Sequence, residues 1–174
     1  MKSVFLLILL SVLPYVTLAD FRINLIAPEG VAFVDIDEGL TGMQGGWLKE
    51  KKDTYLFLSG PLDSRWKSWR FSVVPKRDGF LTIQLVAEGK ENGKDLRVAY
   101  TGVRLEGADL RNGALTEVVN GKPVAWSAVR TPGFGSDAGK NFLLCDRLNY
   151  WTQKIRVEKG RPLQFQILVR KGKP

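Results

Sequence analysis

Apolar and polar residues alternate along most of the chain, a pattern that is typical of half-buried β-strands. The segments that alternate in this way are 31–37, 55–58, 69–73, 81–87, 96–105, 142–145, 151–157 and 163–169. Between them lie stretches rich in Gly, Pro, Asn and Asp, among them Ala27–Gly30, Lys90–Gly93 and Asn120–Pro123. No segment after residue 19 sustains a helical period. Many short strands bounded by turn residues predict an all-β fold, either a two-sheet antiparallel β-sandwich or a jelly roll.

Two of these stretches resemble each other after a shift of 82 residues. WRFSVVPKRDGFLTIQLVA then lies over WTQKIRVEKGRPLQFQILV, with Trp69 on Trp151 and Leu85 on Ile167. Each stretch reads as a strand, a charged turn with glycine and a second strand, which predicts two matching hairpins half a domain apart; chance similarity of alternating strands is the alternative. Strand parity predicts that the following side chains are buried: Trp69, Phe71, Val73, Trp151, Ile155 and Val157.

Residues 1–19 have the layout of a secretory signal peptide. Lys2 precedes an apolar run, and small residues stand before a cleavage point at Asp20. An uncleaved membrane anchor is the alternative; cleavage leaves residues 20–174 as one secreted or periplasmic domain without a stable membrane span. The leader contains one of the 26 cations, so 25 cations face 18 anions in the remainder, a charge of +7. This balance favours polyanions in general, whether nucleic acid, acidic glycan or anionic lipid, and export favours a glycan or the cell envelope among them. Surface charge that only keeps the protein soluble is the alternative.

Two short motifs in the second half are similar to carbohydrate-binding modules of the galactose-binding-like jelly-roll superfamily. Leu110–Glu117 followed by Gly121–Ser127 resembles the opening N-G-D-F-E and G-x-P-x-G-W patterns of those modules, and Gln153–Gly160 resembles their Q-x-V-x-V-x-x-G strand. The expected second half of such a module is similar to residues that come earlier, Trp69–Leu81 and Tyr100–Gly107. The resemblance therefore implies one jelly roll with a circularly permuted strand order, or else two incomplete domains.

The resemblance also implies a structural calcium ion, which many of these modules hold with carboxylate oxygens. Here the corresponding positions are Ala114, Thr116, Thr101 and Gly102, which offer too few oxygens for a cation that takes six to eight. We therefore expect no calcium there, and no other metal or cofactor.

The composition disfavours catalysis. The chain has no histidine, which excludes a Ser-His-Asp triad. Asp35 and Asp37 share one strand face and form the best carboxylate pair for a glycoside hydrolase, but the same spacing fits two solvated carboxylates on an outer face, which are far more common. Cys145 lies in an apolar run and is expected to be a small buried hydrophobe. The glycines of Gly133–Gly139 match no phosphate-binding spacing and predict a flexible loop.

The segment RWKSWRF supplies the candidate ligand site. If Trp69 faces the core, Trp66 lies with Ser68 and Arg70 on the outer face, and Arg65 and Lys67 flank it. An exposed indole can hold a sugar ring, and neighbouring cations can take a carboxylate or sulfate. The alternative is that Trp66 covers the edge of the core and Arg70 is a solvated charge. Trp47 is left open in the same way, as a core cap or an exposed loop residue.

The sequence thus predicts a secreted or periplasmic, non-catalytic binding module whose ligand is a carbohydrate, with an acidic glycan as a specific case. The alternatives are a cell-envelope scaffold domain that holds protein and binds no sugar, and a glycan-active hydrolase. Export and the absence of a basic helix or a recognised module argue against nucleic acid as the partner.

Overall fold

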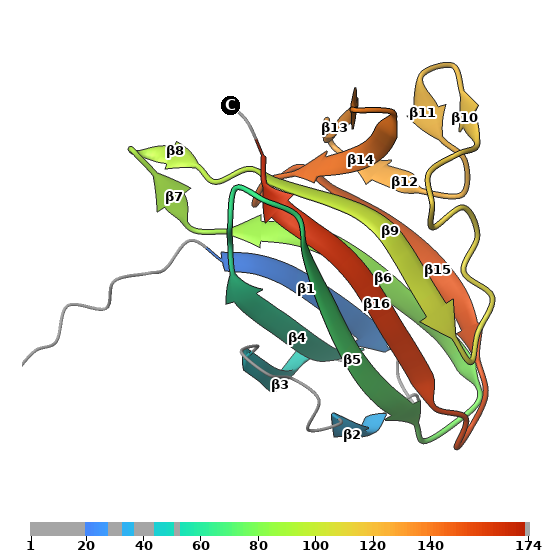
Figure 1. The fold of residues 1–174 in the computed structure, drawn as a ribbon. Coiled ribbons are helices and arrows are strands. Elements are labelled where there is room, and N and C mark those ends of the chain that lie inside the picture. The colour runs from blue at the N-terminus through green and yellow to red at the C-terminus, as the bar shows by residue number, and fades with distance from the viewer. Residues whose placement is uncertain (1–19, 28–32, 37–43, 51–52, 173–174) are drawn as a thin grey trace, which may run out of the picture.

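The computed structural model describes residues 20–27, 33–36, 44–50 and 53–172, which form two antiparallel six-stranded sheets packed face to face (Figure 1). Sheet I contains, in spatial order, β12 (Ser127–Val129), β15 (Tyr150–Val157), β6 (Gly79–Glu88), β1 (Asp20–Ala27), β4 (Asp53–Pro61) and β3 (Gln44–Glu50). Sheet II contains β13 (Gly133–Asp137), β14 (Lys140–Cys145), β9 (Val98–Glu106), β16 (Leu163–Lys171), β5 (Lys67–Pro75) and β2 (Phe33–Ile36). The predicted all-β fold is confirmed as a β-sandwich.

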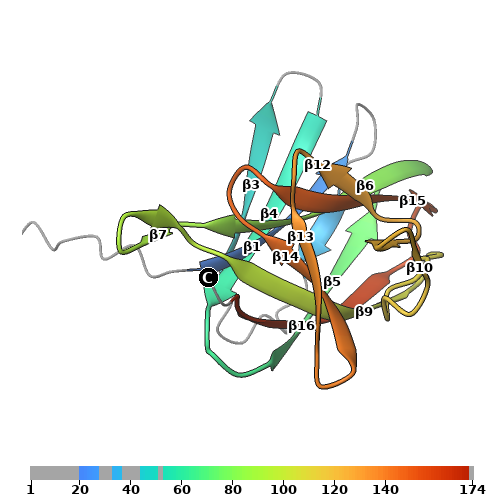
Figure 2. The same cartoon turned by 90° about the horizontal axis from the view of Figure 1, so that it is seen from above.

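Two short ribbons project from this sandwich, β7 (Lys90–Glu91) with β8 (Lys94–Asp95), and β10 (Val118–Val119) with β11 (Lys122–Pro123) (Figures 1 and 2). Each ribbon turns through an Asn-Gly pair with positive φ at both residues, 50° and 77° at Asn92 and Gly93, and 51° and 72° at Asn120 and Gly121. Two such residues make the tight turn whose twist matches antiparallel strands. These two predicted turns are confirmed, whereas the turn predicted at Ala27–Gly30 falls mostly outside the described residues.

The core fills the space between the sheets and is built from alternate residues of each strand. Five of the side chains predicted to be buried are confirmed, each at 5% exposure or less: Phe71, Val73, Trp151, Ile155 and Val157. The prediction is wrong for Trp69, which is half-buried. Its ring lies at the margin of the core, tilted against Phe21 with 5.1 Å between centroids, because β5 has only just begun at Lys67.

The two stretches related by 82 residues are not hairpins, contrary to expectation. β5 belongs to sheet II and β6 to sheet I, and in the same way β15 and β16 lie in different sheets. Pro75 and Pro162 stand beside the two turns and lack the N–H that pairing next to the turn would use. The strands pair across the stretches instead, β6 with β15 and β5 with β16.

The register of these pairs repeats the 82-residue shift. Trp69 lies opposite Ile167, and Trp151 lies opposite Leu85. Strand order repeats as well. Exchanging β1, β2, β3, β4, β5 and β6 with β9, β12, β13, β14, β15 and β16, respectively, converts the order of sheet I into that of sheet II read from the other edge. The sequence similarity is thus matched by equal structural positions, and each sheet contains strands from both halves of the chain.

Residues 133–139 are not the predicted loop. Gly133–Asp137 form β13, which pairs with β14 through a turn at Ala138-Gly139. The glycines make room for neighbours on the partner strand: a Cβ at Gly135 would lie 2.8 Å from the Phe142 ring, and one at Gly133 would lie 3.0 Å from Leu144 Cβ. Glycine weakens the apolar alternation that identifies strands, which explains the wrong prediction.

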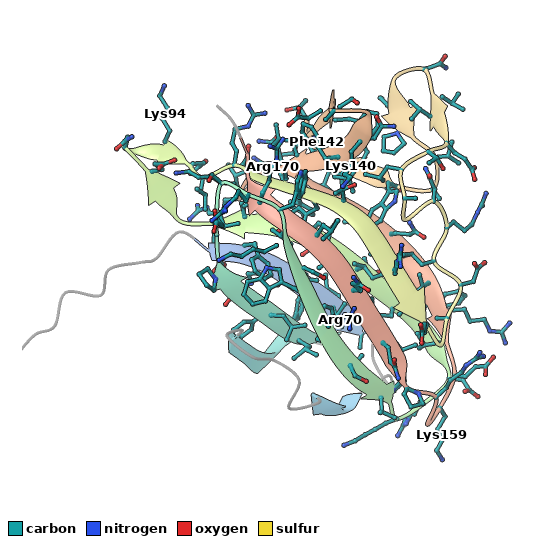
Figure 3. The ribbon with its side chains drawn as sticks, viewed as in Figure 1. Arg70, Lys94, Lys140, Phe142, Lys159 and Arg170 are labelled. Carbon is teal, nitrogen blue, oxygen red and sulfur yellow. The ribbon has the colours of Figure 1, made fainter. Side chains whose placement is uncertain are left out.

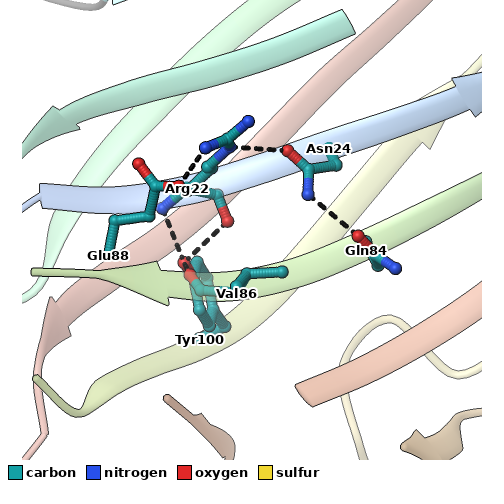
Figure 4. Close-up of polar contacts among 6 residues, drawn as sticks. All are labelled: Arg22, Asn24, Gln84, Val86, Glu88 and Tyr100. Carbon is teal, nitrogen blue, oxygen red and sulfur yellow. Dashed lines mark hydrogen bonds and ion pairs between the residues drawn. The ribbon is translucent and has the colours of Figure 1, made fainter. Parts of the chain in front are cut away.

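A buried tyrosine links the two sheets. Tyr100 on β9 is fully buried, and its hydroxyl reaches the main chain of β1 and β6 across the sandwich (Figure 4). It accepts from the Arg22 N–H at 3.2 Å and has the carbonyl oxygens of Arg22, at 3.1 Å, and of Val86 as acceptors. Above it, on the outer face of sheet I, Arg22 contacts Glu88 and Asn24, and Asn24 donates to Gln84 (Figure 4).

Of the smaller expectations, the one on Cys145 is confirmed and the others stay open. Cys145 is buried in the core as expected, and burial raises the pKa of its thiol far above the ordinary range. Trp47 lies in β3, with its main chain opposite Leu56. The leader and Asp37 lie outside the described residues, so neither the signal peptide nor the Asp35–Asp37 pair is tested. Within the described ranges, no helix has the length and apolar character to span a membrane.

Candidate ligand-binding face on sheet II

The outer face of sheet II carries rows of polar side chains across three neighbouring strands, β5, β16 and β9. The middle row consists of Arg70, Gln166 and Arg104, because Gln166 lies opposite Arg70 on one side and opposite Arg104 on the other. We call these three residues the Arg–Gln–Arg row. Neighbouring strands are about 4.8 Å apart, so the two arginine backbones lie about 10 Å from each other.

A shallow hollow lies over this row. Its volume is about 390 Å³, and its lining residues are Arg70, Phe71, Ser72, Arg104, Glu106, Gln164, Phe165 and Gln166. The side chains of Arg70 and Arg104 are exposed and make no hydrogen bond or ion pair with other described residues. The Gln166 side-chain amide donates to Ser68 Oγ at 3.2 Å. The hollow therefore offers a ligand two exposed cations, two amides, one hydroxyl and the carboxylate of Glu106.

A second feature lies near the carboxyl end of β16. Arg170 is only 9% exposed, and its guanidinium lies 4.7 Å from the Trp66 ring centroid and 5.4 Å from that of Phe142. One terminal nitrogen of Arg170 donates to Asp137 Oδ2 at 3.0 Å. We call Arg170, Trp66, Phe142 and Asp137 the Arg170 cluster; Figure 3 shows Arg170 and Phe142 close together there, with Arg70 further along β5.

The structure divides the four residues predicted as the ligand site. Arg65 and Trp66 line a hollow of about 400 Å³ beside the Arg170 cluster, whereas Arg70 lines the hollow over the Arg–Gln–Arg row. Lys67 forms an ion pair with Asp63 at 3.3 Å. Trp66 precedes β5 and is half-buried, with Arg170 against its ring. The Trp66 ring is therefore partly covered by Arg170, although Trp66 still lines the hollow.

The turn that presents Arg65 and Trp66 is fixed by Asp63. Its carboxylate accepts from the Arg65 main-chain N–H at 3.1 Å and from the Ser64 hydroxyl at 3.3 Å. The pKa of Asp63 is lowered below its ordinary value, first because its carboxylate accepts from the Arg65 N–H and second because it accepts from the Lys67 ammonium. Asp63 also accepts, through its main-chain oxygen, from the Lys171 N–H at 2.8 Å, which holds the turn beside the end of β16.

Sequence reasoning missed several residues that meet at these two places: Arg104, Gln166, Phe142, Lys140, Asp137 and Arg170. Part of the signal was present, because Gln164 and Gln166 alternate with Phe165 and Ile167 and so mark a polar outer face on β16. The alternation cannot identify the neighbouring strands, since β9 and β5 are far from β16 in the chain. Strand pairing, rather than local pattern, brings Arg104 and Arg70 to Gln166.

The positions considered for calcium have other surroundings. Ala114 and Thr116 are exposed, and the Thr101 hydroxyl donates to the Asn141 carbonyl oxygen at 2.6 Å. Across the described ranges, no group of three or more His, Cys, Asp or Glu side chains is gathered in a way that could hold a metal ion.

Comparison of the chain with protein-family models, with curated proteins and with solved structures gives no match. The two-sheet architecture and the outer face of sheet II are therefore the basis for any functional conclusion.

Proposed function

We propose that this chain is a secreted or periplasmic, non-catalytic binding module of the galactose-binding-like jelly-roll type, and that its ligand is a carbohydrate. The observation that carries the proposal is the hollow over the Arg–Gln–Arg row. Sugar hydroxyls are both donors and acceptors, and they match a surface where amide and guanidinium groups alternate at the spacing of adjacent strands.

The size of the hollow supports a small ligand or part of a chain. Its volume of about 390 Å³ falls within the range of small-molecule sites. It lies on the outer face of a sheet, where three paired strands that are far apart in the sequence fix the main-chain positions of Arg70, Gln166 and Arg104. Binding therefore needs no rearrangement of the main chain, and the ordering cost is limited to the side chains that contact the sugar.

A glycan array tests the proposal with the purified protein and two variants. Gln166→Ala removes the amide at the centre of the row, and Lys154→Gln is the control, since Lys154 lies on the outer face of sheet I against Phe80. We expect the wild type and Lys154→Gln to bind the same glycans and Gln166→Ala to bind them roughly tenfold more weakly, which corresponds to about 1.4 kcal/mol. Thermal unfolding checks that Gln166→Ala is folded.

Three results would count against the proposal. An array without signal for any neutral or acidic glycan would favour the scaffold alternative, in which the module binds protein. Binding that Gln166→Ala leaves unchanged would move the site away from sheet II. Release of sugar from a bound glycan would instead support the hydrolase alternative.

A further inference from the structure

Arg170 has fewer partners than a buried guanidinium normally has. Arginine carries five N–H donors in a fixed fork. Within the described residues, Asp137 is the one hydrogen-bonded partner of the Arg170 guanidinium, and the Nε atom is buried with no hydrogen-bond partner. A buried donor without an acceptor costs about 1–3 kcal/mol, so its retention calls for a physical explanation.

The surrounding side chains fix the position of the guanidinium but leave some of its hydrogen-bond donors without an acceptor. The rings of Trp66 and Phe142 lie against it, with 6.2 Å between their centroids, and they offer their π-faces but no acceptor oxygen. Asp137 fixes one terminal nitrogen from the turn end of β13. The guanidinium is therefore oriented in advance, with donor capacity left over.

Two hollows open beside it. The larger, of about 400 Å³, is lined by Ser64, Arg65, Trp66, Asp137, Ala138, Lys140 and Arg170. The smaller, of about 220 Å³, lies along β13 and β14 and shares Asp137 and Arg170 with the first. The larger hollow thus combines three cations, Arg65, Lys140 and Arg170, with one carboxylate, and its local charge is +2.

We infer that this hollow is an anion-binding subsite that receives the sulfate or carboxylate substituent of an acidic sugar. An oxyanion in the hollow can accept hydrogen bonds from the terminal N–H donors of Arg170, and its charge is balanced by Arg65 and Lys140. Arginine binds such groups through paired N–H donors, which requires a fixed guanidinium plane. The inference rests on the proposed carbohydrate function and narrows the ligand to charged glycans.

Binding measurements with matched polymers test the inference and separate the two substituents. Dextran sulfate is compared with unsulfated dextran, and polygalacturonate with its methyl ester, by isothermal titration calorimetry. We expect binding of at least one charged polymer and weaker binding of its uncharged counterpart. If only dextran sulfate binds, the subsite takes sulfate; if only polygalacturonate binds, it takes carboxylate. Equal affinity for charged and uncharged members of both pairs would overturn the inference.

Charge-removing variants locate the subsite. Lys140 and Arg65 are exposed, so Lys140→Gln and Arg65→Gln should leave the fold intact. Lys159→Gln removes the same charge at the opposite end of sheet II and is the matched control (Figure 3). We expect Lys140→Gln to weaken binding of the charged polymer about tenfold and Lys159→Gln less than about twofold. Equal losses in the two variants would mean diffuse attraction to a basic surface and would overturn the inference.

Arg170 is observed directly through its Nε–H signal in ¹H–¹⁵N spectra, assigned by its disappearance in Arg170→Lys. Inorganic sulfate should shift this signal and leave the Arg104 Nε–H signal unchanged. A shift with sulfate but no binding of any glycan would support the anion site and contradict the carbohydrate function. Glycan binding that depends on Gln166, without any shift at Arg170, would leave the carbohydrate function standing and overturn the subsite.

Discussion

At the scale of single residues, the hydroxyl of Tyr100 is the clearest example of a polar atom with a structural task. It lies in the apolar layer between the sheets and bonds main-chain groups of Arg22 and Val86, which are opposite each other on β1 and β6. The ring fills core volume while the hydroxyl bonds the facing sheet. Removing the oxygen alone therefore separates these two contributions.

Tyr100→Phe should lower the free energy of unfolding by about 1–3 kcal/mol, because it keeps the ring and leaves buried main-chain groups without this partner. Urea unfolding measures the change. Tyr150→Phe is the control, since Tyr150 is half-buried and its hydroxyl makes no hydrogen bond with the described residues. Equal stability of the two variants would show that the hydroxyl contributes nothing.

The same residue predicts an alkaline limit to stability. Burial raises the pKa of Tyr100 well above its ordinary value of 10.0. The unfolded chain releases this proton near pH 10 and the folded chain does not, so the stability is full below about pH 10 and falls as pH rises above it. Unfolding free energies at about pH 8 and about pH 10.5 should therefore differ more in the wild type than in Tyr100→Phe. An identical difference in both proteins would contradict this.

The two repeated tryptophans should differ in their effect on stability, although the sequence predicted the same burial for both. Trp151 is 2% exposed and its indole N–H donates to the Gly133 carbonyl oxygen at 2.8 Å, whereas Trp69 is half-buried. Trp151→Ala should cost about 3–5 kcal/mol and Trp69→Ala clearly less. Thermal unfolding of both variants decides the order, and a larger loss for Trp69→Ala would reverse the assignment.

At the scale of elements, the long connection between β9 and β10 is organised around Asn112. Its side-chain amide donates to the carbonyl oxygens of Glu117 and Val124 and accepts from the Glu117 N–H. Its main-chain oxygen accepts from the indole of Trp126, which is buried. This is the segment that resembles the opening motif of the carbohydrate-binding modules, and here its asparagine and tryptophan hold a loop together.

Asn112→Ala removes three side-chain hydrogen bonds at once and should lower the free energy of unfolding by about 1–3 kcal/mol, since the freed groups of an otherwise ordered loop lose their partners. Chemical denaturation measures this loss. Glu117→Gln is a suitable control because Asn112 contacts only its main chain. An Asn112→Ala protein as stable as the control would mean that water replaces the amide fully.

Alternation along the chain predicted eight strand segments because a strand with one face toward a core alternates apolar and polar residues, and this signal is local. β1 and β3 were not predicted, and β13 was expected to be a loop because glycines interrupt its pattern. The site was predicted only in part. Arg70 was placed on the outer face by parity, but its relation to Gln166 and Arg104 depends on pairing between segments far apart in sequence.

At the scale of the whole molecule, neither half of the chain can complete the sandwich alone. β6 needs β15 beside it in sheet I, and β5 needs β16 beside it in sheet II. Each half therefore leaves apolar strand faces and unpaired edges that the other half covers. The segment that connects the halves runs through the β7–β8 ribbon and its exposed Asn92-Gly93 turn.

Fragments that end at Asn92 and begin at Gly93 should each lack cooperative unfolding, and an equimolar mixture should recover it. The break lies in an exposed turn, where no core contact is lost, and every strand pair of the two sheets can form again. Near-ultraviolet circular dichroism of the separate and mixed fragments measures this. Cooperative unfolding of the first fragment by itself would contradict the interdependence of the halves, as it would for segments 21–107 and 108–174.

The matched registers of β5·β16 and β6·β15 have a consequence for assembly. Trp69 of the first half pairs with Ile167 of the second, and the equivalent residues Trp151 and Leu85 pair in the opposite sense. Each half therefore contacts the other through equivalent positions. That reciprocity defines an isologous interface, the kind formed by two identical subunits around a two-fold axis. The protein has the geometry of a strand-exchanged homodimer joined into one chain by residues 89–97. A duplicated and fused gene for a half-sized dimeric ancestor would give this architecture directly.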